Sequence, residues 1–217
     1  MIAIICAMDK EAEGLISHLQ SKEEITVCGI KFYKGVLCGK EAVVTGCGVG
    51  KVRAAAVTAI AIEKFSPDLV INSGVAGGTP PLKQGDLVVP VKSVEHDYYA
   101  PDEPTVYYDC DEKVSGMLLN ACRSLGRDAK SCTIATGDCF IDKPEKVAYL
   151  KEKYGAEAFD MESAAIAKTC SMFGVKCAFV RAISDNGADD NMKSFYEFLC
   201  EAAERSQNVV EQFLKNL

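Results

Sequence analysis

Three acidic side chains stand just after runs of apolar residues: Glu11, Glu162 and Asp185. Each apolar run is typical of a buried strand, and the ligands of open α/β sheets gather beyond the carboxyl ends of strands. Two carboxylates whose surroundings shift their pKa values in opposite directions form a usable acid and base. The three residues are therefore candidates for acid–base chemistry at one edge of a sheet.

Each acidic residue also has a purely structural interpretation, which is favoured when that residue is taken alone. Glu11 and Glu162 could be first-turn helix charges that the helix dipole stabilises. Asp185 precedes an Asn-Gly pair and could belong to a turn. Together with Asp189 and Asp190 it could form a metal loop, but a solvated acidic turn explains these residues better.

Two glycine-rich segments, residues 46–50 and 74–78, are predicted to form turns after other strands. The first lacks the glycine that a dinucleotide-binding motif needs at position 51 and the Ser or Thr that a Walker motif needs after Lys51. The chain has no C-x-x-C pair, and His18 and His96 are its only histidines, so structural zinc is not expected. We expect no metal and no organic cofactor.

The elements that position these residues alternate between strands and helices along all 217 residues, with no repeat or linker. We therefore expect one domain, residues 1–217, of the α/β class: a three-layer α/β/α fold with a central mixed β-sheet. The predicted strands are 2–6, 25–28, 32–37, 42–45, 69–72, 86–94, 131–135, 157–159 and 177–183; segments 22–24, 29–31 and 39–40 separate three of them into an antiparallel meander. The predicted helices begin with one that has Asp9 as its N-cap, continue with 51–64, 114–124, 145–153 and 161–173, and end with one that a capping box at Ser194 opens.

The overall charge excludes several kinds of partner. The chain carries 24 Lys and Arg against 31 Asp and Glu, a net charge of −7, and has no basic cluster. Such a chain is a poor electrostatic match for nucleic acid or an anionic membrane. Its eleven cysteines are odd in number and several lie in apolar runs, which indicates free thiols. Since no apolar stretch reaches the ~18 residues of a spanning helix and the amino-terminal run lacks a basic leader, we expect a cytoplasmic protein.

Five motifs occur in a fixed order along the chain: Ala7-Met8-x-x-Glu11, Asn72-x-Gly74-x-Ala76-Gly77-Gly78, Gly137-Asp138-x-Phe140-Ile141, Asp160-Met161-Glu162-Ser163-Ala164-Ala165 and Arg181-Ala182-Ile183-Ser184-Asp185. With these motifs the chain closely resembles the bacterial 5′-methylthioadenosine/S-adenosylhomocysteine nucleosidases, within the purine nucleoside phosphorylase-like family. The resemblance covers nearly the whole chain and implies the fold of that family.

The resemblance implies hydrolysis of the N-glycosidic bond of 5′-methylthioadenosine and S-adenosylhomocysteine, with release of adenine and a thioribose product. It implies that Asp185 protonates the purine, that Glu11 activates the attacking water, and that Glu162 bonds the ribose hydroxyls. The other substrate-binding residues that it implies are Phe140 stacked on the base, Ile141 at the base edge, Met161 on the sugar, Arg181 orienting the carboxylates or the water, and Ala7, Gly77 and Ser184 beside them.

The two catalytic carboxylates need opposite protonation. To donate a proton at neutral pH, Asp185 needs a pKa raised by roughly 3 units from ~3.9, which burial beside the base can supply. Glu11, in a first helical turn, would be held ionised by the helix dipole. Phosphorolytic members of the family bind phosphate with arginines and glycine amides where Glu11 stands here, and a carboxylate beside a dianion is unfavourable, so water is the expected nucleophile.

Two departures from the family concern the 5′ end of the nucleoside. Val75 stands where the nucleosidases often carry Ser or Thr, and residues 97–111, with four tyrosines, are shorter than the family segment that covers the 5′ group across a dimer interface. We expect a homodimer in which the partner's segment near Tyr107 closes the site. The alternatives are phosphorolysis, hydrolysis of a purine nucleoside with another 5′ group, and a nucleoside-binding module without turnover.

Overall fold

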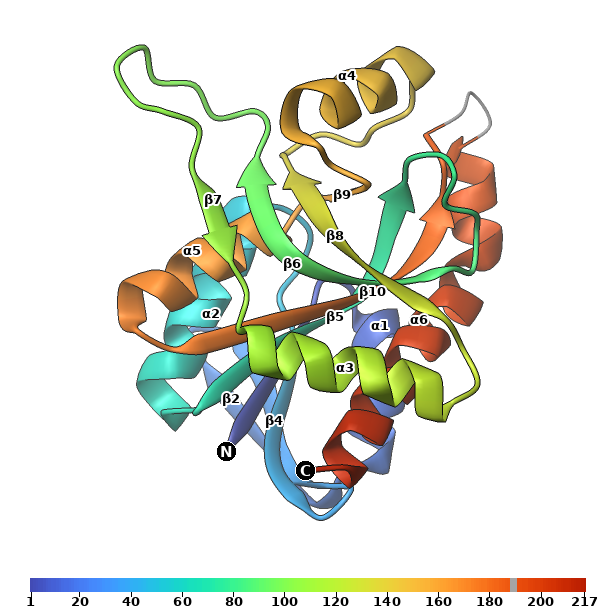
Figure 1. Cartoon of the computed structure of the whole chain (residues 1–217). Helices are drawn as coiled ribbons and strands as arrows, with labels where there is room; N and C mark the ends of the chain where they lie inside the picture. The colour runs from blue at the N-terminus through green and yellow to red at the C-terminus, as the bar shows by residue number, and fades with distance from the viewer. Residues whose placement is uncertain (188–190) are drawn as a thin grey trace.

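The computed structural model describes residues 1–187 and 191–217, with the backbone alone for residues 191–197. Within these residues the chain forms ten strands and six helices (Figure 1). The strands are β1 (Ile2–Cys6), β2 (Gln20–Val27), β3 (Ile30–Leu37), β4 (Lys40–Gly46), β5 (Leu69–Gly78), β6 (Leu87–Glu95), β7 (Tyr107–Asp109), β8 (Ala129–Thr136), β9 (Ala158–Asp160) and β10 (Lys176–Asp185). The helices are α1 (Asp9–His18), α2 (Lys51–Phe65), α3 (Glu112–Ser124), α4 (Pro144–Tyr154), α5 (Ser163–Phe173) and α6 (Asn191–Lys215).

The strands form one mixed sheet, as expected. β1 lies between β4 and β5 and is parallel to both, and β5 is also parallel to β10. At one end β2, β3 and β4 form the predicted antiparallel meander. At the other end β10 also pairs with β6, and β8 and β9 lead back from β6 to β5, so five strands close into a ring. The sequence pattern does not predict this closure.

Helices cover the sheet from both sides. α1, α3 and α6 pack on one face, and α2 and α5 pack on the other (Figure 1). Neighbouring residues of β1 face opposite layers: Ile4 belongs to the core with α1, α3 and α6, whereas Ile5 belongs to the core with α2 and α5. Both side chains are fully buried, each stabilising the fold by about 1.5–3 kcal/mol. The expected three-layer α/β/α fold is confirmed.

The start of α1 differs from the prediction. Its N-cap is Met8, and Asp9 is the first helical residue instead of the cap. The reason is the Glu11 carboxylate, which accepts a hydrogen bond of 2.8 Å from the Met8 N–H. That carboxylate therefore serves one of the donors at the helix start, a role expected of Asp9.

The starts of α5 and α6 also differ. α5 begins at Ser163, so Met161 and Glu162 lie in the connection that follows β9 rather than in the helix. α6 begins at Asn191, ahead of the predicted start at Ser194. The side chains of the predicted capping box lie outside the described residues.

Two predicted loops are strands. Residues 74–78 continue β5 instead of turning. At Gly74 an added Cβ would lie 2.4 Å from Oε1 of Glu11, so this glycine makes room for a carboxylate inside the strand. Residues 22–24 belong to β2, an edge strand whose charged side chains face solvent and so lack an apolar pattern.

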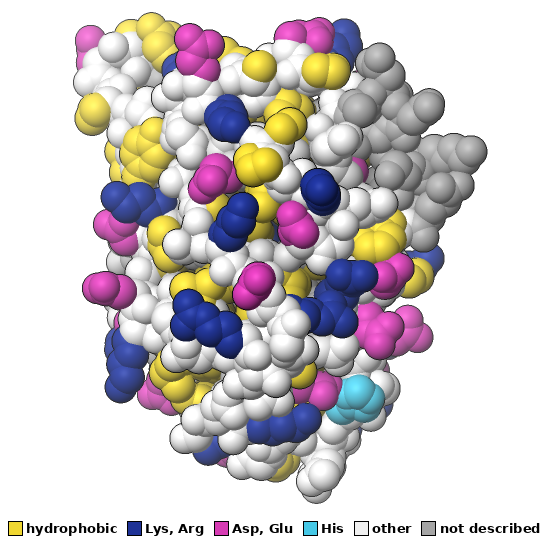
Figure 2. Space-filling view, turned by 45° about the vertical axis from the view of Figure 1, so that its right-hand side comes forward, with side chains coloured by type: hydrophobic (Ala, Val, Ile, Leu, Met, Phe, Trp, Pro, Cys, Tyr) yellow, Lys and Arg dark blue, Asp and Glu magenta, His cyan; other side chains and the backbone are white. Residues whose placement is uncertain are grey.

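The surface mixes charges of both signs. On the face in Figure 2, Lys and Arg side chains lie among Asp and Glu, with hydrophobic side chains between them. No helix in the described part of the chain is long and apolar enough to cross a membrane. The same residues contain no group of three or more His, Cys, Asp or Glu arranged to hold a metal. All eleven cysteines are free thiols.

Candidate active site

A cavity of about 310 Å³ lies where β1, β5 and β10 reach their carboxyl ends, the place expected for a ligand in this fold class. It brings together residues from six separate parts of the sequence. The expected site residues that line it are Ala7, Glu11, Gly77, Phe140, Ile141, Met161, Glu162, Ser184 and Asp185. The remaining expected residue, Arg181, is buried behind the wall.

Glu11 is held rigidly at the floor of the cavity. Its Oε2 accepts a hydrogen bond from the Met8 N–H and its Oε1 accepts one from the Val75 N–H, both at 2.8 Å. Burial raises the pKa of Glu11, while these amides and the positive charge of Arg181 oppose the rise. The direction is opposite to the one expected from the helix dipole, because the side chain is only 2% exposed. A raised pKa makes Glu11 a stronger base toward water.

Asp185 lies at the end of β10 and is also buried. The Ser184 hydroxyl donates a hydrogen bond of 2.7 Å to its Oδ2, and the Gly187 N–H donates one of 3.3 Å to Oδ1. This arrangement fixes the carboxyl group at the cavity wall. The metal loop considered with Asp189 and Asp190 lies outside the described residues.

Glu162 is fixed by the first turn of α2. The Gly50 N–H donates a hydrogen bond of 2.8 Å to Oε1, and the Met161 N–H donates one of 3.3 Å to Oε2. Burial and the neighbouring negative charge of Asp160 raise the pKa of Glu162 to about 8. The Glu162 carboxyl group therefore changes its protonation state slightly above neutral pH.

Arg181 acts on the site from behind the wall. Its Nη2 donates to Oδ2 of Asp160 at 2.9 Å and to the Ser163 hydroxyl at 2.8 Å, and it also donates to the Asn72 side chain. Its described ion pair is with Asp160, and its positive charge also opposes the rise in the pKa of Glu11. Its buried charge offsets the acidic cluster around it. That it orients the carboxylates or the water stays a prediction.

The cavity also has lining residues that are not among the predicted site residues: Met8, Val49, Val75, Ala76, Cys139, Phe159 and Asp160. The Phe159 ring lies against β5, so closely that a Cβ on Gly77 would be 1.9 Å from its Cε2. Asp160 accepts hydrogen bonds from the Thr136 and Ser163 hydroxyls, both at 2.6 Å. Asp160 opens the motif that contains Met161 and Glu162, and Phe159 precedes it, so proximity to that motif is the signal that the sequence offers.

The connection that carries Phe140 is fastened to α2. The Lys51 N–H donates to Oδ1 of Asp138, and the Asp138 N–H donates to Oδ2 of Asp97, both at 2.7 Å. The Lys51 ammonium closes this network with bonds of 2.6 Å to Asp97 and 3.1 Å to Glu95. The network joins the base of the segment 97–111 to the wall of the cavity.

The tyrosines of that segment divide into two groups. Tyr98 is 51% exposed and Tyr99 is 84% exposed, in the loop that projects beyond β6 and β7 (Figure 1). Tyr107 is 40% exposed and its hydroxyl donates to the backbone of Tyr154. Tyr108 instead packs partly buried against the core beside α5.

The cavity suits a reaction in which positive charge develops on the ligand. Four acidic side chains line it, those of Glu11, Asp160, Glu162 and Asp185, and its described lining contains no basic side chain. An ionised carboxylate such as that of Glu11 stabilises a cationic transition state and repels an anionic co-substrate. Its aromatic and aliphatic wall, with Phe140, fits a flat apolar ring system.

The fold and the site together define a family. A model of the phosphorylase superfamily matches residues 1–215, and the chain belongs to this superfamily. The chain is 38% identical over 224 residues to the 5′-methylthioadenosine/S-adenosylhomocysteine nucleosidase of Geobacillus kaustophilus, a match that covers 98% of this chain and 95% of that protein.

Solved structures agree with this assignment. The 5′-methylthioadenosine/S-adenosylhomocysteine nucleosidase of Neisseria meningitidis, in complex with methylthio-immucillin-A, superimposes with a TM-score of 0.94 at 33% identity, covering 100% of this chain and 99% of that one. Futalosine hydrolase of Helicobacter pylori also superimposes with a TM-score of 0.94, at 30% identity, covering 100% of this chain and 97% of that one. The expected family is confirmed.

Proposed function

We propose that this chain hydrolyses the N-glycosidic bond of 5′-methylthioadenosine and S-adenosylhomocysteine, releasing adenine and the thioribose product. The observation that carries the proposal is the shared cavity in which buried Glu11 and Asp185 lie with Glu162. The relatives named above, which carry this activity in their names, support the same substrates.

The proposed reaction assigns one proton transfer to each catalytic residue. The oxygen of a water molecule attacks C1′ of the ribose while the C1′–N9 bond breaks, and the electron pair of that bond leaves on the purine. Glu11 takes the proton that the water loses, and Asp185 donates a proton to N7 of the purine. The products are neutral adenine and the free sugar. Positioned proton-transfer groups of this kind contribute typically about 10²–10⁴-fold each.

The remaining contacts position the substrate in this proposal. Glu162 bonds the ribose hydroxyls and Met161 packs on the sugar, while Phe140 stacks on the base and the Ile141 backbone contacts its edge. Ala7, Gly77 and Ser184 also line the cavity. Arg181 is a positioning residue, which reaches the lining through its bond to Asp160.

Water is the proposed nucleophile because phosphate meets an unfavourable site. A phosphate dianion beside Glu11 would meet the negative charge of that carboxylate in a cavity whose described lining holds no basic side chain. At close range in a partly buried site, this repulsion amounts to several kcal/mol. A neutral water molecule meets no such barrier and gains a hydrogen-bond acceptor.

We also propose a cytoplasmic homodimer that acts in methionine salvage. Free thiols support a reducing compartment, since eleven unpaired cysteines are unusual where disulfides form. Exposed Tyr99, Tyr98, Val106 and Tyr107 in and beside the projecting loop support an interface there, since tyrosines are enriched at such surfaces. In the dimer, this loop of the partner closes the site.

A second candidate is hydrolysis of a purine nucleoside with a larger 5′ group. The similarity to futalosine hydrolase and the shortened segment 97–111 favour it. Base release from a panel of nucleosides, followed by ultraviolet absorbance or chromatography, tests both candidates. The first predicts the highest kcat/KM for 5′-methylthioadenosine and S-adenosylhomocysteine. Faster release from a nucleoside with another 5′ group would favour the second.

A further inference from the structure

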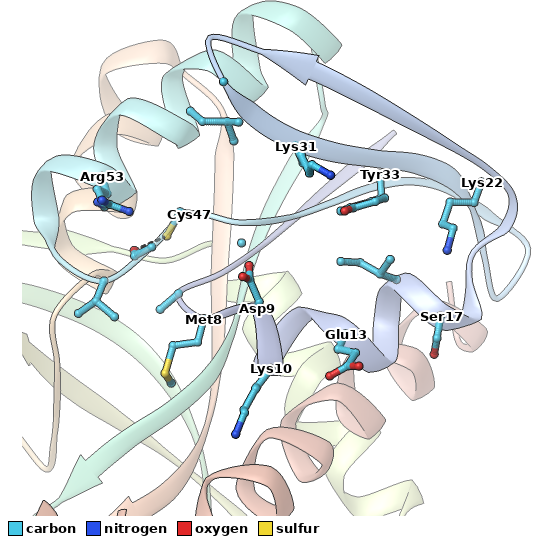
Figure 3. Close-up of a pocket in the computed structure, with 17 residues that line it drawn as sticks. Met8, Asp9, Lys10, Glu13, Ser17, Lys22, Lys31, Tyr33, Cys47 and Arg53 are labelled. Atoms are coloured by element: carbon cyan, nitrogen blue, oxygen red, sulfur yellow. Dashed lines mark hydrogen bonds between the residues drawn. The ribbon is translucent and has the colours of Figure 1, made fainter. Parts of the chain in front are cut away.

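A second hollow of about 1080 Å³ lies beside the cavity, between α1, the β2–β3 hairpin and the start of α2 (Figure 3). We call it the groove. Ala7, Met8 and Val49 line both the groove and the cavity, so the two hollows share a border. Apart from Ala7 on the shared border, the proposed reaction uses no residue of the groove. A nucleoside substituent that leaves the cavity past Met8 and Val49 enters it.

The charges of the groove differ from those of the cavity. Its lining includes the basic residues Lys10, Lys22, Lys31 and Arg53 and the acidic residues Asp9 and Glu13. Four positive charges against two negative ones leave an excess of two, although the whole chain has a net charge of −7. The carboxylates of the cavity repel an anionic group, and the groove attracts it.

Two oppositely charged side chains pack against two glycines, Gly46 and Gly48, at this border. The Arg53 guanidinium lies on Gly48, where an added Cβ would be 2.6 Å from its Nη1. The Asp9 carboxylate lies against Gly46, where an added Cβ would be 2.7 Å from its Oδ1. Figure 3 shows Cys47 between the two side chains.

Both charged groups are available to a ligand. Among the described residues, neither the Arg53 guanidinium nor the Asp9 carboxylate has a hydrogen bond or an ion pair. Lys31, by contrast, is engaged by Glu24 at 3.0 Å. A cation against Gly48 and an anion against Gly46, not joined to each other, match the two ends of a zwitterion.

We propose that Arg53 and Asp9 bind the amino-acid end of a 5′ substituent, Arg53 taking the α-carboxylate and Asp9 the α-ammonium group. The inference rests on the proposed function and names the residues that distinguish its two substrates. S-adenosylhomocysteine ends in such a zwitterion, whereas 5′-methylthioadenosine ends in a methyl group. A planar guanidinium can bond both carboxylate oxygens, which a lysine cannot do in the same geometry.

The test crosses two variants with three nucleosides. Arg53→Ala and Asp9→Asn are assayed with S-adenosylhomocysteine, with 5′-methylthioadenosine, and with the decarboxylated analogue whose 5′ group is aminopropylthio. Each variant should raise the KM for S-adenosylhomocysteine about fivefold, the effect of one partly exposed charge pair. Arg53→Ala should not alter the KM for the aminopropylthio analogue, but Asp9→Asn should raise it. Both variants should leave the KM for 5′-methylthioadenosine within about twofold.

The controls separate this idea from a general loss of charge or fold. Lys64→Ala removes one positive charge from the same helix, far along from the groove, and should change none of these constants. Light scattering and thermal unfolding should show the same assembly and stability for Arg53→Ala as for the wild type. Raised salt should increase the wild-type KM for S-adenosylhomocysteine more than that for 5′-methylthioadenosine, because salt screens an exposed pair.

Equal changes for all three nucleosides, or none, would overturn the assignment of Arg53 and Asp9 while leaving the proposed function intact. If the wild type released no adenine from any of them, the proposed function would fail instead. In that case S-adenosylhomocysteine is not consumed, and its affinity for the wild type and for Arg53→Ala, measured by calorimetric titration, still tests the groove. Unchanged affinity in Arg53→Ala would reject it, and a fivefold loss would support it.

Discussion

The Gly50 N–H donates a hydrogen bond of 2.8 Å to Oε1 of Glu162, so the first turn of α2 holds a carboxylate of the cavity. Burial and the charge of Asp160 nevertheless raise the pKa of Glu162 to about 8, from an ordinary value of 4.5. Between these two pH values the folded chain keeps a proton on Glu162 that the unfolded chain has lost. The free energy of unfolding therefore falls as the pH rises through this window.

Replacing Glu162 should remove that pH dependence. Gln keeps the shape and does not titrate, so Glu162→Gln should gain stability relative to the wild type as the pH rises from 5 to 8. Urea unfolding at both pH values measures the difference. Glu63→Gln, an exposed change on α2, is the matched control and should follow the wild type. The same pH dependence in Glu162→Gln and wild type would contradict a raised pKa.

The catalytic carboxylates should be indispensable to turnover. Asp185→Asn cannot donate a carboxyl proton, and Glu11→Gln cannot accept one from water. Each change should lower kcat by at least ~10²-fold, with the far-UV circular dichroism spectrum unchanged. Steady-state release of adenine measures the effect, and Glu63→Gln again serves as the control. A variant that kept a near-native kcat would remove its residue from the proposed mechanism.

Gly77 should be intolerant of any side chain. An added Cβ would lie 1.9 Å from the Phe159 ring, which must then shift into the cavity. Gly77→Ala should therefore raise the KM for 5′-methylthioadenosine by ~10-fold or more and lower the thermal midpoint, an overpacking cost of about 1–3 kcal/mol. In Gly116→Ala the new methyl group meets nothing within 4 Å, and this helix substitution should be neutral or stabilising. Equal KM values and thermal midpoints in the two variants would contradict this prediction, because the Phe159 ring would then have moved aside without loss of stability or binding.

The projecting loop should control assembly and the 5′ pocket. Tyr99→Ala together with Tyr107→Ala should weaken the dimer and raise the KM for 5′-methylthioadenosine far more than that for adenosine. Tyr108 is left in place because it packs against the core. Tyr149→Ala, at an exposed tyrosine on α4, is the control. A wild-type light-scattering mass of a single chain would refute the dimer, and equal KM changes on both nucleosides would refute the role in specificity.

Local patterns in the sequence predict much of this fold because strands and helices here have clear apolar periodicity. The run Ile2–Cys6 and its neighbours predict parallel strands, and residues after parallel strands meet at one edge. That rule brings Glu11 and Asp185 into one cavity, although they are far apart in sequence. Glu162 joins them because it follows β9, which pairs antiparallel with β5 in the closed ring. Their meeting supports the functional interpretation over three unrelated structural ones.

What the patterns miss depends on contacts between distant segments. Gly74 resembles a turn glycine, and only the Glu11 carboxylate opposite it explains why a strand needs it. Phe159 and Asp160 enter the site because β9 pairs with both β5 and β8 in the closed ring. Arg181 and Asp185 belong to the same strand, but the pairing of that strand with β5 shifts register between Ile183 and Asp185. The Arg181 side chain pairs with Asp160, a contact between distant segments that the spacing does not show.

The same dependence explains the pKa of Glu11. Its place in a first helical turn is visible in the sequence and predicts a stabilised negative charge. Burial by β5 and α6 is not visible there, and it shifts the pKa in the other direction. Only the folded surroundings decide which effect is larger.

The identity of the sugar product tests the central claim most directly. The wild-type protein is incubated with 5′-methylthioadenosine in phosphate-free buffer and in buffer with phosphate, and the sugar is identified by mass spectrometry. Hydrolysis through Glu11 predicts the same rate of adenine release in both buffers and free methylthioribose as the product. Release that requires phosphate and yields methylthioribose 1-phosphate would contradict the claim.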